Sequence, residues 1–184
     1  MPVKRLEFEE LAPAVADRLG ARVKRLGYLG EFFRCAAHQP QALAAFIDFT
    51  EAGKGALDDR LVEVIALTVA NWMDNAYERH QHERLSMRLG FGRDWIESIN
   101  RLEPDEPSIL KPEERRMQRL VLRILETRGR GAAVLFEEAV AEIGQESAVA
   151  VLMVVGRYVT HALIVNTLGL APPVPSIFED GFGG

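Results

Sequence analysis

The segment EVIALTVANWMDNAYERHQH, residues 63–82, contains two helical patterns joined by a short polar junction. In its first half, apolar side chains recur three and four residues apart, as they do in an amphipathic helix. Asp74 or Asn75 can then accept a hydrogen bond from the first turn of a second helix, because short polar side chains are favoured at that position. The segment therefore predicts two consecutive helices that meet near Met73.

The same helical periodicity continues on both sides of this segment, and few stretches alternate in the way that strands do. Prolines and glycines mark many of the expected helix ends. The predicted helices cover residues 12–26, 29–37, 40–52, 59–73, 75–89, 94–102, 112–127, 132–143 and 147–168. The sequence thus predicts an all-α, single-domain helical bundle that spans residues 1–184.

Three segments interrupt these helices. Residues 53–56, with the sequence GKGA, predict a turn, and residues 103–108, with the sequence EPDEPS, predict a surface linker. Residues 171–184 are rich in proline and glycine. We expect this tail to lie extended on the surface or on a neighbouring subunit.

Composition limits the classes of function. The chain has 184 residues, a net charge of −5 and a pI near 5.5, which argues against a nucleic-acid-binding face. The most apolar stretch, residues 148–156, is shorter than the roughly 20 residues that span a bilayer, and the N-terminus lacks the apolar run of a signal peptide. We expect a cytoplasmic protein with no nucleic-acid or membrane partner.

A candidate acid/base site lies in the central segment. A helix places Glu78 and His82 one turn apart on one face, and Glu63 is available from the preceding helix. A carboxylate beside a histidine fixes its tautomer and raises its pKa, so the other ring nitrogen can exchange a proton with a substrate. Tyr77 offers a hydroxyl to a carboxylate or an enolate. The predicted catalytic residues are His82, Glu78, Glu63 and Tyr77.

Simpler interpretations of the same residues remain open. Asn75 and Glu78 have the spacing of a capping box, and Glu78 with His82 can be an exposed helix pair. His80 points away from His82 and is expected at the surface or at an interface. His161, on the apolar last helix, is expected to be a core histidine bonded to a backbone carbonyl, with a place in the pocket as the alternative. A metal ion shared by the carboxylates and His82 is disfavoured, because structural zinc needs more Cys or His ligands.

Cys35 is the single cysteine of the chain, so it cannot form an internal disulfide. Its neighbours in FFRCAA are mostly apolar, which favours a buried, unreactive thiol. The chain contains no dinucleotide-binding or phosphate-binding glycine motif and no nucleophile elbow. We therefore expect neither a cofactor nor a metal.

The central pattern resembles the carboxymuconolactone decarboxylase and alkylhydroperoxidase D family. In this pattern Asn75 follows Glu63 by twelve residues, Glu78 follows three residues later, and His82 four after that. The likeness covers about residues 29–173. Its further segments are FFRCAAHQPQALAAFIDF (32–49), LDDRLVEVIALTVAN (57–71) and VGRYVTHALIVNTLGL (155–170).

The resemblance implies an all-helical fold that assembles into a homo-oligomer, as a dimer, trimer or hexamer. Redox members carry Cys at the positions of Asn75 and Glu78, so the absence of both cysteines disfavours thiol peroxidase activity. The branch without cysteines implies a cofactor-independent, decarboxylase-like acid/base enzyme for a small unsaturated carboxylic acid or lactone. Arg60, Arg79 and Arg157 are candidates to bind its carboxylate. The alternatives are a peroxidase-related antioxidant protein and a non-catalytic oligomeric small-ligand-binding protein.

Overall fold

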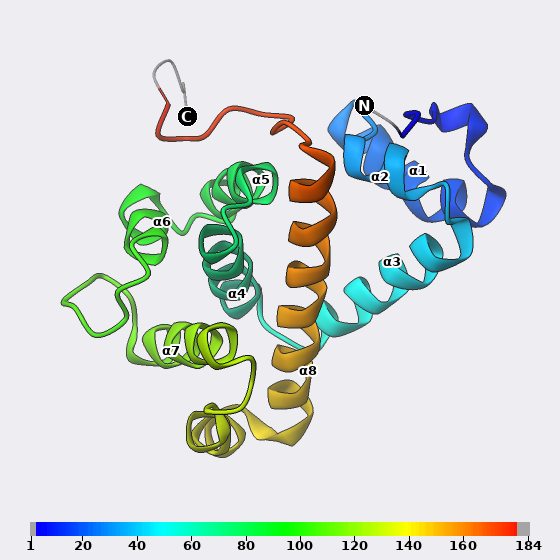
Figure 1. Cartoon of the computed structure of the whole chain (residues 1–184). Coiled ribbons are helices and arrows are strands. Elements are labelled where there is room, and N and C mark those ends of the chain that lie inside the picture. Colours follow the sequence, from blue (N-terminus) through cyan, green and yellow to red (C-terminus); the bar gives the residue numbers. More distant parts are fainter. Residues whose placement is uncertain (1–2, 180–184) are drawn as a thin grey trace.

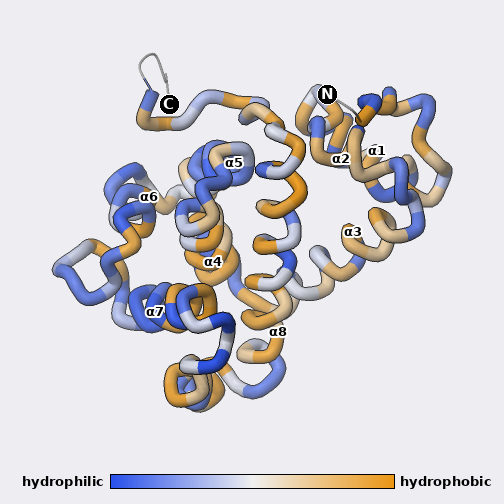
Figure 2. The backbone as a smooth tube through the Cα atoms, viewed as in Figure 1, coloured by the Kyte–Doolittle hydropathy of each residue, from blue (hydrophilic) through white to orange (hydrophobic). Residues whose placement is uncertain are grey.

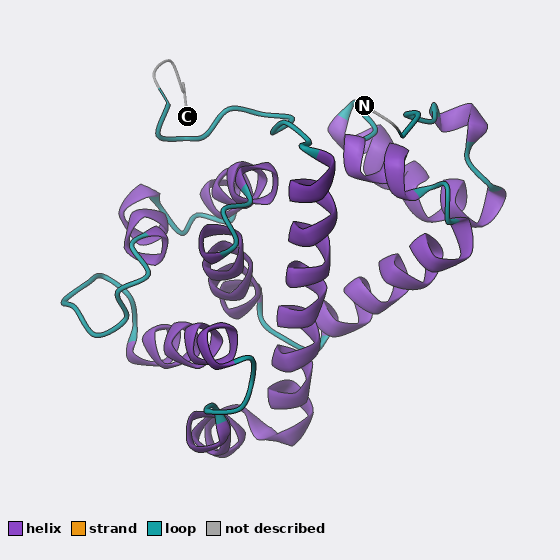
Figure 3. Ribbon diagram, in the orientation of Figure 1, coloured by secondary structure: helices purple, strands orange, loops and turns teal. Residues whose placement is uncertain are grey.

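The computed structural model describes residues 3–179, and within that range the chain forms helices and no strand (Figures 1 and 3). This confirms the predicted all-α class. The elements are η1 (Phe8–Glu10), α1 (Pro13–Leu26), α2 (Glu31–Ala36), α3 (Pro40–Gly55), α4 (Asp59–Trp72), α5 (Ala76–Arg88), α6 (Arg93–Asn100), α7 (Pro112–Thr127) and α8 (Ala133–Leu168).

Helix α4 is the centre of the fold. The Asp58 side chain accepts a hydrogen bond from Leu61 N and starts the helix, and the ten residues from Leu61 to Ala70 are all buried. Helices α5, α6, α7 and α8 surround it. Because this buried stretch is mainly apolar, a charged side chain within it must have a buried partner. Glu63 is the charged residue of the stretch.

Helix α8 runs between two groups of helices (Figure 1). On one side, α4, α6 and α7 share a hydrophobic cluster with α8 that includes Ile65, Trp95 and Val151. On the other side, α1, α2 and α3 form a second cluster around Leu19, Phe32 and the C-terminal end of α8. Figure 2 shows that the outer faces of several surrounding helices are hydrophilic. The functional residues lie where these two clusters meet along α8.

The long helix α8 combines the two helices predicted for residues 132–168. Gly144 interrupts it with a φ of 81°, at the predicted break, and Gly169 ends it in the left-handed conformation. By length and composition α8 could cross a membrane, but 56% of its most apolar window is buried in this fold. The core helix of a folded protein can have the same length and composition. The sequence predicted that residues 148–156 are too short a stretch to span a bilayer.

The predicted turn at residues 53–56 is wrong, because α3 continues through Gly55. Gly53 is buried, and a Cβ atom placed on it would lie 3.1 Å from Val154 Cγ2 of α8. Glycine is therefore needed here for close helix packing and not for chain reversal. The close approach brings the last turn of α3, including Lys54, against α8.

The tail from residue 170 to residue 179 packs on its own chain. Ser176 Oγ donates a 2.5 Å hydrogen bond to Glu83 Oε2 of α5, and the Ile177 side chain is buried in the first cluster. His80 lies beneath this strap with Nδ1 3.1 Å from Val174 O, so its predicted surface position is wrong. The tail thus follows the surface of its own chain, and residues 180–184 of the predicted tail lie outside the described residues.

We expect the Ile177→Ala substitution to lower the free energy of unfolding by about 2–5 kcal/mol, because it leaves a cavity in the core. Urea denaturation at two protein concentrations measures this, and the loss should not depend on concentration. Ile109→Ala is the matched control, since Ile109 is 62% exposed and Ile177 only 1%. A loss of less than about 1 kcal/mol would show that the tail does not dock in this way.

Candidate active site

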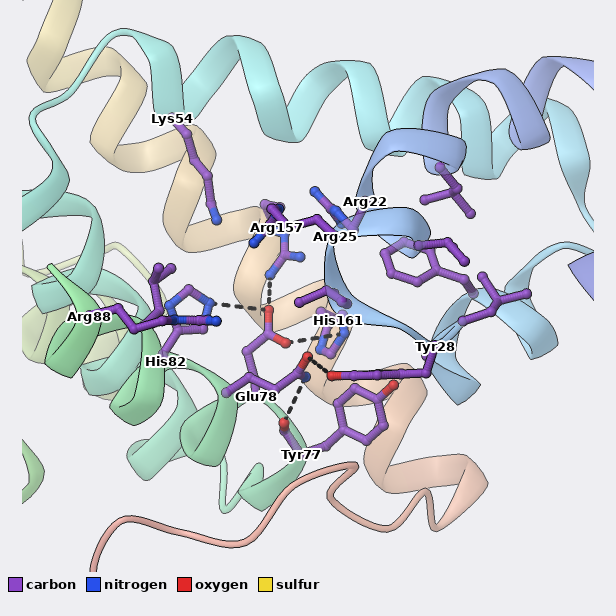
Figure 4. A pocket seen from close by; sticks show the side chains of 18 residues that line it. Arg22, Arg25, Tyr28, Lys54, Tyr77, Glu78, His82, Arg88, Arg157 and His161 are labelled. Carbon is purple, nitrogen blue, oxygen red and sulfur yellow. Dashed lines mark hydrogen bonds and ion pairs between the residues drawn. The ribbon is translucent and has the colours of Figure 1, made fainter. Parts of the chain in front are cut away.

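A pocket of about 180 Å³ opens between the two groups of helices (Figure 4). Its walls come from α1, the loop at Tyr28 to Gly30, the end of α3, α5 and α8. Three of the predicted site residues, Tyr77, Glu78 and His82, line it. Glu63 lies behind His82 and reaches the pocket only through that histidine.

Glu63 and His82 form the inner pair of the site. His82 Nδ1 is 2.8 Å and 2.9 Å from the two carboxylate oxygens of Glu63, and Ser86 Oγ donates a 3.0 Å hydrogen bond to Oε2. Ser86 lies one turn after His82 on α5, so one face of α5 supplies both donors to a carboxylate on α4. Glu63, rather than Glu78, is therefore the carboxylate that orients the imidazole.

The other ring nitrogen of His82 faces the pocket residues. Nε2 is 3.7 Å from Glu78 Oε1 and 3.3 Å from the Tyr158 hydroxyl. Burial acts to lower the pKa of His82, but the charge and hydrogen bond of Glu63, together with Glu78, outweigh it and raise the pKa above its ordinary value. The raised pKa favours the imidazolium form of His82, in which Nδ1 donates to Glu63.

Glu78 is the carboxylate that faces the pocket. Arg157 of α8 donates to its Oε1, and His161 Nε2 lies 3.5 Å from its Oε2. Burial acts to raise the pKa of Glu78, but protonated His161, Arg157 and His82 together place it well below the ordinary value. Because His161 is itself neutral at pH 7, Arg157 and His82 are the partners that keep Glu78 ionised there.

His161 lines the pocket, and its partners are side chains. Asn75 Nδ2 lies 3.4 Å from His161 Nδ1, so Nδ1 accepts and Nε2 carries the hydrogen that faces Glu78. Burial lowers the pKa of His161 to about 4. The expected bond to a backbone carbonyl is wrong, and the alternative of a place in the pocket is correct.

Tyr77 lies on the pocket wall, but its hydroxyl is already engaged. Tyr77 Oη accepts a 3.3 Å hydrogen bond from Phe32 N at the start of α2. Burial raises the pKa of this phenol, so it stays protonated and keeps one hydrogen to donate. Tyr158 contacts His82 directly but is not a lining residue of the pocket, so Tyr77 is the hydroxyl placed nearer a bound substrate.

The sequence did not single out Lys54 or Tyr158, and it placed Arg157 only among three candidates. The signal available was the pattern R-Y-x-x-H within an apolar helix, which puts Arg157 and His161 one turn apart on one face. Arg60 binds Glu114 instead, and Arg79 lies beside Glu83. Those two arginines therefore lie outside the pocket.

The capping interpretation is correct in one half only. Asn75 caps α5 by accepting a 3.2 Å hydrogen bond from Glu78 N, whereas the Glu78 side chain turns to Arg157. The exposed-pair interpretation of Glu78 and His82 is wrong, since both side chains are buried. Within residues 3–179, no group of three or more His, Cys, Asp or Glu side chains is arranged to hold a metal ion.

Cys35 lies on α2 in the second hydrophobic cluster and does not line the pocket. Burial raises the pKa of its thiol. A thiol of this kind is a poor nucleophile, because the thiolate is the reactive form. The described residues that line the pocket therefore include no cysteine.

The Arg157→Met substitution should lower the free energy of unfolding by about 3–5 kcal/mol, because it removes the arginine that binds the buried Glu78 carboxylate directly. The double variant Arg157→Met/Glu78→Met removes both charges and leaves the Glu63 and His82 pair balanced. We therefore expect the double variant to lose less unfolding free energy than the sum of the losses in the two single variants, as measured by urea denaturation. Simple additivity would show that the two side chains do not form a coupled pair.

No family model and no curated protein matches this chain. A search of solved structures found a crystal structure from Ralstonia eutropha JMP134, described as an alkylhydroperoxidase AhpD core and an uncharacterized peroxidase-related protein. It is 19% identical to this chain, covers 94% of this chain and 93% of its own, and superposes with a TM-score of 0.77. The chain therefore has the fold of the alkylhydroperoxidase D core, as its sequence pattern predicted.

Proposed function

We propose that this protein is a cofactor-independent acid/base enzyme that acts on a small unsaturated carboxylic acid or lactone. The observation that carries the proposal is the state of His82. Its Nδ1 is bound by Glu63, its pKa is raised, and its Nε2 faces the pocket beside Glu78. A buried imidazolium held in one orientation is suited to give a proton to a carbanion or an enolate.

The charge of the pocket favours an anionic substrate. Among the residues that the structure describes, the Lys and Arg side chains that line it are Arg22, Arg25, Lys54, Arg88 and Arg157, whereas Glu78 is the one acidic lining residue. Arg25 and Arg88 are exposed and can attract an anion from solvent, although the chain carries a net charge of −5. The small volume of the pocket fits a small acid better than a drug-sized ligand.

In the proposed reaction, the bond between the substrate and its carboxylate breaks and CO2 leaves. The electron pair moves into the unsaturated system as an enolate, so no cofactor is needed to hold it. His82 Nε2 donates its proton to the substrate carbon, and the imidazole is protonated again from solvent. Glu63 holds the ring, Glu78 stabilises its charged form, and Tyr77, which lines the pocket, donates a hydrogen bond to the enolate oxygen.

A peroxidase-related function is the second candidate, because the similar structure from Ralstonia eutropha is described in those words. Thiol chemistry in the pocket is disfavoured, since Asn75 and Glu78 occupy the positions expected for the cysteines and Cys35 lies elsewhere. A non-catalytic ligand-binding protein would show thermal stabilisation by small acids without turnover.

We also propose that the protein is a homo-oligomer. Val149, Leu152, Met153 and Leu163 of α8 are exposed apolar side chains on a helix that is otherwise a core element. Apolar side chains gathered on one element favour association with another protein surface. The cytoplasmic location remains a prediction from the sequence.

The His82→Gln substitution should lower kcat by about 100- to 10,000-fold, or about 3–5 kcal/mol of barrier, because it removes the proton donor. The assay follows the ultraviolet absorbance of a carboxymuconolactone substrate. His38→Gln is the matched control, since His38 is exposed and outside the pocket. Because the acid must be protonated and its pKa is raised, the fall of wild-type kcat with rising pH should be centred above the ordinary histidine pKa.

Equal turnover by His82→Gln and the wild type would contradict the proposed role of His82. No turnover by the wild type would reject this substrate. Consumption of an organic hydroperoxide by the wild type, lost in Cys35→Ser, would instead support the peroxidase-related alternative.

A further inference from the structure

Lys54 is a basic side chain of the pocket that the proposed reaction does not use. It lies in the last turn of α3, where Gly53 lets that helix approach Val154 of α8. Its side chain points toward the region of Arg157 and His82 (Figure 4). The Nζ atom is 5.4 Å from the centroid of the Tyr158 ring. Within the described residues, it makes no hydrogen bond and no ion pair.

The carboxylates around Lys54 are already bound to other groups. Glu78 accepts from Arg157, and Glu63 accepts from His82 and Ser86. Glu51, one turn before Lys54 on α3, binds Arg22. The amine is thus left available to a ligand while its acidic neighbours serve other cations.

The surroundings of Lys54 also favour the neutral amine. Burial lowers the pKa of Lys54, and the nearby Arg157 charge lowers it further, whereas Glu78, Glu63 and Glu51 act in the opposite direction without reversing the shift. A lysine that is desolvated or that lies beside another cation is an activated nucleophile, because the unprotonated amine is the reacting form.

We propose that Lys54 is a carbonyl-reactive residue that forms a reversible imine with a small 2-oxo acid bound in this pocket. The basic lining of the pocket would hold the acid's carboxylate, and the unpaired amine would meet its carbonyl carbon. This activity goes beyond the proposed acid/base function and does not require decarboxylation to occur.

The step balances with residues that line the pocket. The lone pair of Lys54 Nζ attacks the carbonyl carbon, and the carbonyl π electrons move to oxygen, which takes a proton from His82. The nitrogen of the adduct then returns its extra proton to His82, which delivers it to the hydroxyl group, and that group leaves as water. The net change is one neutral amine, one carbonyl and one proton from His82 giving one iminium ion and one water, so no oxidant or reductant is needed.

The test is reductive trapping of the full-length protein with pyruvate and sodium borohydride, followed by intact mass measurement and peptide mapping. We expect one reduced pyruvate adduct, located at Lys54. Lys54→Arg keeps the positive charge and should lose the adduct. The matched control Lys24→Arg changes an exposed lysine of α1 and should retain it. Circular dichroism melting shows that each variant is folded.

Acetone, which has the carbonyl but no carboxylate, should give less adduct than pyruvate at equal concentration. The absence of an adduct on the folded wild-type protein would overturn the proposal. An adduct of equal amount in Lys54→Arg, or one located at another amine, would overturn it as well. Equal trapping of acetone and pyruvate would reject the assignment to 2-oxo acids. None of these outcomes depends on the turnover assay for His82.

Discussion

The site depends on a chain of buried charges in which Glu63, His82, Glu78 and Arg157 alternate in sign. Burying one ionised side chain costs several kcal/mol, so none of the four would be stable alone at its position. As an ordered set, two negative and two positive groups cancel, and most of their hydrogen-bonding atoms find partners. This constraint explains why residues from three separate helices must meet at one point, and why the pKa of His82 is raised although the ring is buried.

The fold provides that meeting point. Helix α4 carries Glu63 in its buried interior, α5 presents His82 and Glu78 one turn apart, and α8 brings Arg157 between the two hydrophobic clusters. The pocket and the buried charges both lie between the two hydrophobic clusters. The same packing of α3 against α8 at Gly53 places the unpaired amine of Lys54 in this pocket.

Much of the fold could be predicted from the sequence, because apolar periodicity and capping residues are local signals. Pro112 to Thr127 forms a helix with the predicted bounds, and Gly144 breaks α8 at the predicted residue. Residues 53–56 were mistaken for a turn because the role of Gly53 is a contact with a helix about one hundred residues away in the chain. The pairing of Glu78 with Arg157, the strap over His80 and the place of Lys54 are long-range contacts of the same kind. A single sequence carries no local signal for them.

The most direct test of the buried charge chain is nitrogen NMR of the histidine rings in protein labelled with ¹⁵N-histidine, recorded from pH 4 to pH 8. The His82 and His161 signals can be assigned with single substitutions. The account predicts that His82 loses its second ring proton at a higher pH than an ordinary histidine does, whereas His161 is protonated only near pH 4. A His82 ring that titrates at or below the ordinary histidine pKa would contradict the alternating charges and, with them, the proton donor on which the proposed chemistry rests.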